Sequence, residues 1–89
     1  MTYKVEIDQN GRGGTIRYIE DEQTLSFGWE FSMDGADIFV PTPAQWDANT
    51  RWASGRRQEI LERVAAEVRD QKAKSASVSI EDNWISLRF

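Results

Sequence analysis

Three arginines and two tryptophans lie within residues 41–60, PTPAQWDANTRWASGRRQEI. Arg51, Arg56 and Arg57 come at the start of a helical pattern, where positive charges oppose the helix dipole, so a negative group should lie nearby. Free backbone N–H groups and arginine forks together can hold a phosphate or a carboxylate. The stretch therefore predicts a small-anion site, with one of the two tryptophans beside it.

The same stretch has a simpler interpretation. The acidic residues 20–22 (EDE), or Asp47, can neutralise the arginines within the chain, and exposed ion pairs of this kind are common but weak. Trp46 and Trp52 can pack at the ends of the only core of a small domain. The sequence favours core packing for the tryptophans and keeps the anion site as an alternative.

Other chemistry is restricted by what the chain lacks, since it has neither histidine nor cysteine. This excludes thiolate nucleophiles, disulfides, zinc–thiolate sites and catalytic triads that use a histidine. The loop DQNGRGG (residues 8–14) resembles a calcium loop, but Arg12 and Ile19 stand where calcium ligands belong. We therefore expect no enzyme, no cofactor and no metal site.

The formal net charge is −4, and it is unevenly spread. Residues 1–41 carry three basic and eight acidic groups, which disfavours binding to nucleic-acid phosphates. No apolar run approaches the roughly 20 residues that cross a bilayer, and MTYKVEIDQN enters a strand pattern without a signal peptide. We expect a cytoplasmic protein that binds neither nucleic acid nor membrane. An acidic inhibitor or immunity-like protein with a basic target is a further alternative.

Apolar and polar residues alternate along the first half of the chain, as in strands with one buried face. The alternating runs are residues 3–8, 15–20 and 25–33. A two-residue turn at residues 34–35 would pair Trp29 with Val40. This register keeps the large odd-numbered side chains, Met33 included, on the core face.

Helical patterns follow in the middle of the chain. Residues 42–45 (TPAQ) fit a capping box with proline at the first helical position, which predicts a short helix through about Ala48. A long helix over residues 54–73 follows, because apolar residues recur on one stripe. A last hairpin with its turn at residues 82–83 pairs Ile80 with Ile85.

The order β-β-β-β-α-α-β-β predicts one α+β domain over residues 1–89, a two-layer fold in which a main helix covers one face of an antiparallel sheet. Alternation turns several side chains to the opposite face, and the candidate interaction residues there are Ile19, Phe39, Trp84 and Arg88.

Two aromatic side chains on one face would form the centre of an interface if they are adjacent and if no other segment covers them. Where the last hairpin docks decides whether Phe39 and Trp84 are adjacent. Our leading hypothesis is a non-catalytic module that dimerises or binds a protein partner through this face.

Overall fold

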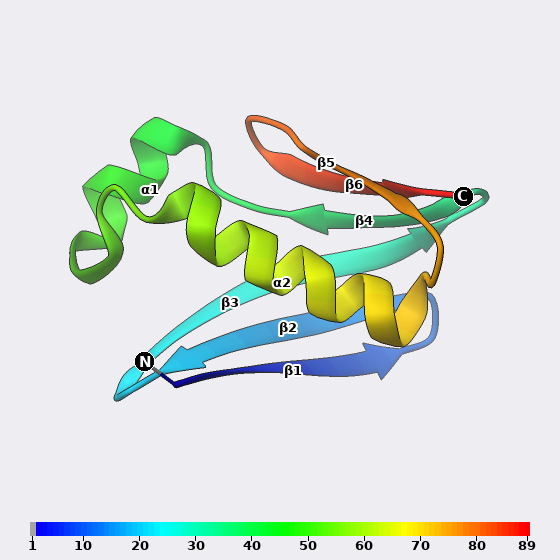
Figure 1. The fold of residues 1–89 in the computed structure, drawn as a ribbon, viewed down its shortest axis with the longest axis horizontal. Helices are drawn as coiled ribbons and strands as arrows, with labels where there is room; N and C mark the ends of the chain where they lie inside the picture. Colours follow the sequence, from blue (N-terminus) through cyan, green and yellow to red (C-terminus); the bar gives the residue numbers. More distant parts are fainter. Residues whose placement is uncertain (1) are drawn as a thin grey trace.

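The computed structural model describes residues 2–89 and has an α+β fold of two layers, a six-stranded antiparallel sheet with helices on one face (Figure 1). The elements are β1 (Tyr3–Asn10), β2 (Gly13–Glu20), β3 (Gln23–Ser32), β4 (Gly35–Phe39), α1 (Pro43–Asn49), the 3-10 helix η1 (Arg51–Ala53), α2 (Arg57–Lys72), β5 (Ser77–Ile80) and β6 (Trp84–Arg88). The strand order in the sheet is β1-β2-β3-β4-β6-β5. The predicted fold class is therefore confirmed.

The last hairpin has the predicted register and joins the sheet through β6. Ile80 pairs with Ile85, and β6 pairs with β4 on its other side. This docking places Trp84 directly opposite Phe39. The local hairpin was readable from the sequence, whereas the strand that it joins was not.

The β3–β4 hairpin differs from the predicted register by two residues. Its turn consists of Met33 and Asp34, so Trp29 pairs with Ile38 instead of Val40. A shift of two residues leaves every strand side chain on its predicted face. The prediction was wrong for Met33, which is fully exposed in the turn rather than on the core face.

Gly35 explains this difference, because β6 passes very close to its backbone. A Cβ atom at this position would lie 1.8 Å from the carbonyl oxygen of Leu87. Asp-Gly is a favoured turn pair, so the local pattern assigned the glycine to the turn. The long-range contact requires it in β4 instead.

The two helices begin with different local signals. Thr42 caps α1 as predicted: its side chain accepts a hydrogen bond from the Gln45 N–H, and the Gln45 side chain accepts one from the Thr42 N–H. The long helix begins at Arg57 rather than at residue 54, because η1 and Gly55, with a φ of +79°, come between the two helices.

The core lies between α2 and the inner face of the sheet. The predicted stripe of α2 is buried and consists of Ile60, Leu61, Val64, Ala65 and Val68. Trp46 closes one end of this core: it is fully buried, and its indole N–H donates to the Ala53 carbonyl at 2.9 Å. Core packing is thus observed for this tryptophan. Within residues 2–89, no helix combines the length and the apolar character needed to cross a membrane.

Candidate functional site

The arginines at the start of α2 were the first candidate site. The Arg56 guanidinium donates to both carboxylate oxygens of Glu20, from Nη1 at 2.8 Å and from Nη2 at 2.9 Å. It also pairs with Glu59 at 2.9 Å and lies 6.0 Å from the Trp52 ring. Because Glu20 is only 3% exposed, this is a buried ion pair that joins β2 to the start of α2.

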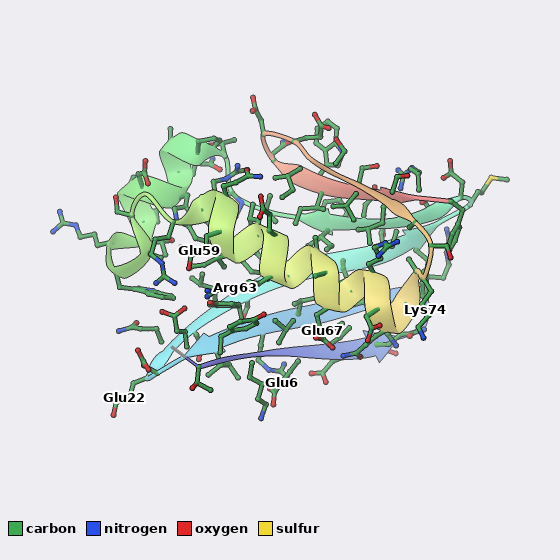
Figure 2. The ribbon with its side chains drawn as sticks, in the orientation of Figure 1. Glu6, Glu22, Glu59, Arg63, Glu67 and Lys74 are labelled. Carbon is green, nitrogen blue, oxygen red and sulfur yellow. The ribbon has the colours of Figure 1, made fainter. Side chains whose placement is uncertain are left out.

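Further donors surround the same carboxylate, and Figure 2 shows one of them, Arg63, on the same helix as Glu59. The Tyr18 hydroxyl donates to Glu20 Oε1 at 2.5 Å, and Arg63 Nη1 lies 3.4 Å from that atom. The hydrogen bonds from Arg56 and then from Tyr18 lower the pKa of Glu20 to about 2, against the opposing effect of burial. The negative group expected near the arginines is therefore present within the chain.

The other two arginines have different surroundings. Arg57 donates to three backbone carbonyls, those of Pro41, Glu81 and Asp82, and so ties the start of α2 to the β5–β6 turn. Arg51 is exposed. An external anion at the three arginines stays a prediction, and the geometry gives it little support because Arg56 and Arg57 reach different parts of the chain.

The outer face of the sheet carries the aromatic pair. Phe39 and Trp84 are register partners on adjacent strands and are 49% and 42% exposed, so no described segment of the chain covers them. On the neighbouring strand β3, the register partner of Phe39 is Gly28. A Cβ atom at Gly28 would lie 3.7 Å from the Phe39 ring, so the ring leans over a part of β3 that has no side chain.

A hollow of about 430 Å³ adjoins the aromatic pair, lined by Asp37, Phe39, Asn83, Trp84 and Arg88. Arg88 forms one wall of it and is held by two carboxylates, those of Asp37 at 2.8 Å and Asp34 at 3.4 Å. The hollow is therefore bounded by aromatic rings, one amide and a neutralised arginine.

The charges without partners on this face are acidic. Lys4 pairs with Glu6 at 2.9 Å, and Arg17 pairs with Asp8 at 2.7 Å. Arg88 is likewise paired with Asp37, so each of these three basic side chains of the outer face forms an ion pair with a carboxylate.

Two carboxylates near the aromatic pair have no such counter-charge. Within residues 2–89, neither Glu30 nor Glu81 has a basic partner, and Glu30 stands directly opposite Asp37 in the ladder. Like charges in this arrangement are unfavourable, and Arg88 offsets the charge of Asp37 but not that of Glu30. A cation from outside the chain could therefore pair with Glu30.

Three of the four predicted interaction residues lie together, and the fourth does not. Phe39, Trp84 and Arg88 line one hollow. Ile19 also belongs to the outer face, but it lies on β2, where it pairs with Lys4 and Thr24. No local pattern marks Asn83 or Asp37 as site residues, because their proximity to the aromatic pair depends on how the last hairpin docks.

Among residues 2–89 there is no group of three or more acidic side chains placed to hold a metal ion. Comparisons of the chain with protein-family models, with curated proteins and with solved structures find no match. The function must therefore be inferred from the geometry of the outer face.

Proposed function

We propose that this protein is a non-catalytic interaction module that binds a basic segment of a partner protein on the outer face of its sheet. The observation that carries the proposal is the register pairing of Phe39 with Trp84, both about half exposed, near Glu30, a carboxylate without a basic partner within residues 2–89. Exposed aromatic residues with a polar rim are typical of the centre of a protein interface.

The charges favour a basic partner over an acidic one. Arginine and lysine bind over aromatic faces and pair with carboxylates, and Trp84 and Phe39 lie next to Asp37 and Glu30 in the ladder. The net charge of −4 would also steer a basic partner toward the protein. A second copy of this face would bring its own unpaired acids against these, which argues against homodimerisation here.

An affinity measurement with matched variants tests the proposal. An oligo-arginine peptide is titrated into the wild-type protein and into Trp84→Ser by calorimetry, and we expect the affinity to fall about 30-fold, as for an aromatic hot spot worth about 2 kcal/mol. The control is Phe89→Ser, which removes an aromatic side chain that is 73% exposed and lies outside the hollow. We expect this variant to bind like the wild type.

Two results would contradict the proposal. One is equal affinity of the wild type and Trp84→Ser for the peptide. The other is an equal loss in both variants, which would show that the aromatic pair has no special part in binding.

A further inference from the structure

The outer edge of β5 has backbone groups without a partner strand. β5 is the last strand of the sheet, and the Glu81 N–H donates to the Trp84 carbonyl at 2.8 Å where the hairpin closes. Backbone groups in an antiparallel ladder alternate between the two sides of a strand. The N–H and C=O groups of Ser77 and Ser79 therefore point toward β6, whereas those of Val78 and Ile80 point outward, away from the sheet.

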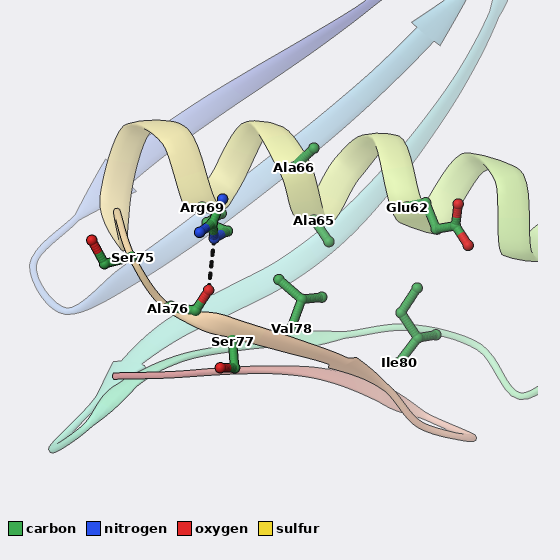
Figure 3. Close-up of a pocket in the computed structure, with 9 residues that line it drawn as sticks. All are labelled: Glu62, Ala65, Ala66, Arg69, Ser75, Ala76, Ser77, Val78 and Ile80. Atoms are coloured by element: carbon green, nitrogen blue, oxygen red, sulfur yellow. Dashed lines mark hydrogen bonds between the residues drawn. The ribbon is translucent and has the colours of Figure 1, made fainter.

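A groove runs beside this edge, between β5 and α2 (Figure 3). Its volume is about 630 Å³. Val78, which is 41% exposed, and Ile80 point toward the helix, where the small side chains of Ala65 and Ala66 leave the space open. Apolar surface thus lies next to the outward-facing backbone groups.

We propose that a second copy of the chain binds at this edge, through antiparallel β5–β5 pairing about a two-fold axis at Ser79. In this register Val78 of each copy lies opposite Ile80 of the other. Because both residues present their backbone groups outward, each such pair exchanges two N–H···O bonds. The same segment supplies both sides of the contact, as an isologous interface requires.

The charges along the groove fit a second copy. Glu62 lies at one end of the groove, near Ile80, and Arg69 lies at the other end, where its Nε donates to the Ala76 carbonyl (Figure 3). Within residues 2–89 the only side-chain partner of Glu62 is Gln58, and Arg69 has no carboxylate partner. A two-fold axis reverses the direction of the groove, so the acidic end of each copy lies beside the basic end of the other.

The opposite edge of the sheet offers a less suitable surface. β1 lies under charged side chains from α2: Lys72 donates to Gln9 at 2.8 Å, and the Arg63 guanidinium lies 4.4 Å from the centre of the Tyr3 ring. The surface beside β1 therefore carries charged side chains of α2, whereas an apolar groove lies beside β5. The pairing is therefore assigned to β5.

Such a dimer would have two partner-binding sites. The β5–β5 contact makes one continuous sheet and keeps both Phe39–Trp84 pairs on the same face. The two β6 strands would be separated by three strand spacings, or about 14 Å. A partner with two basic segments could bind both sites with increased avidity. The dimer itself does not depend on the proposed function.

The absence of cysteine from the chain allows a test of this register. Ser79 would form a non-hydrogen-bonded pair with itself across the axis, with Cα atoms about 4.5 Å apart, within reach of a disulfide. The two copies of Ser77 would lie about 14 Å apart, which is beyond that reach. Both serines are exposed on the same strand and point to the same face, so Ser77→Cys is a matched control for Ser79→Cys.

We expect Ser79→Cys to form a covalent dimer under mild oxidation and Ser77→Cys to remain monomeric on a non-reducing gel. Light scattering of the wild type at about 0.1 mM should give twice the chain mass of 10.2 kDa. This concentration is above the micromolar Kd of the weaker specific interfaces, so a specific dimer would be populated. Equal cross-linking of the two variants, or a monomeric wild type at this concentration, would overturn the proposal.

A second variant separates this dimer from the proposed function. Trp84→Ser should leave the mass at twice that of the chain, because the outer face takes no part in β5–β5 pairing. A dimer that is lost in this variant would place the contact on the outer face and overturn the edge proposal.

Discussion

The Glu20–Arg56 cluster and the outer-face aromatic pair are both candidate sites. They differ in how far their side chains already have partners within the chain. Glu20 is buried and accepts hydrogen bonds from Arg56, Tyr18 and Arg63. Phe39 and Trp84 are register partners across the ladder but remain about half exposed. The comparison indicates that charge is used internally to join β2 to α2, whereas the aromatic surface is left open to other molecules.

The largest effect is expected where the internal pairing is broken. Glu20→Gln removes the negative charge but leaves two arginines around the buried side chain, so the free energy of unfolding should fall by about 3 kcal/mol. Urea denaturation measures this difference. Glu22→Gln, an exposed neighbour in the β2–β3 turn, should change it by less than about 0.5 kcal/mol. Similar effects in the two variants would contradict the structural role of Glu20.

Acid should remove the same contribution from the wild type. The pKa of Glu20 is lowered from 4.5 to about 2 in the folded protein, so its carboxylate stabilises the fold above about pH 4.5. That stability declines as the pH falls and is lost as the pH passes through about 2.

The stability difference between the wild type and Glu20→Gln, measured by thermal unfolding, should therefore shrink over this interval. A difference that stays constant from pH 5 to about pH 2 would show that the ionised carboxylate is not its source.

A smaller effect is expected for the unpaired acid of the outer face. Glu30→Lys replaces the unpaired acid with a cation opposite Asp37, which opposes the binding of a basic ligand. Its affinity for oligo-arginine should fall about 10-fold, mainly through slower association, while the stability is unchanged or slightly higher. Stopped-flow fluorescence at two salt concentrations measures the association rate. A rate that does not depend on salt would argue against charge steering.

The smallest effect on stability is expected for the aromatic pair itself. Because Trp84 is exposed on a face that the chain does not cover, Trp84→Ser should change the free energy of unfolding by less than about 1 kcal/mol. Urea denaturation of this variant beside Glu20→Gln gives the comparison directly. A loss as large as that for Glu20→Gln would show that the pair is part of the core.

The sequence predicted what depends on neighbouring residues. The α2 stripe, the Thr42 capping box and the register of the last hairpin are confirmed because spacing and turn residues determine them. It could not determine contacts between distant segments. The Gly35 backbone must fit against β6, and this requirement moves the β3–β4 turn by one residue and shifts the register by two.

The same limit applies to the candidate sites. Arg56 and Glu20 are 36 residues apart, so the sequence could offer the acidic residues 20–22 only as one of several partners for the arginines. The proximity of Trp84 to Phe39 depends on the pairing of β6 with β4, which no local pattern specifies. The candidate residues could therefore be predicted from the sequence, whereas the pairs that they form could be identified only from the structure.

One nuclear magnetic resonance titration tests the central claim by presenting both charges to the same protein. Oligo-arginine and oligo-glutamate are added separately to the isotope-labelled wild type, and the backbone and indole N–H signals are followed. We predict that oligo-arginine shifts the signals of Trp84, Phe39 and Asp37, and that oligo-glutamate shifts none at the start of α2. Shifts of Arg51, Arg56 and Arg57 by oligo-glutamate, with none of Trp84 by oligo-arginine, would contradict the account.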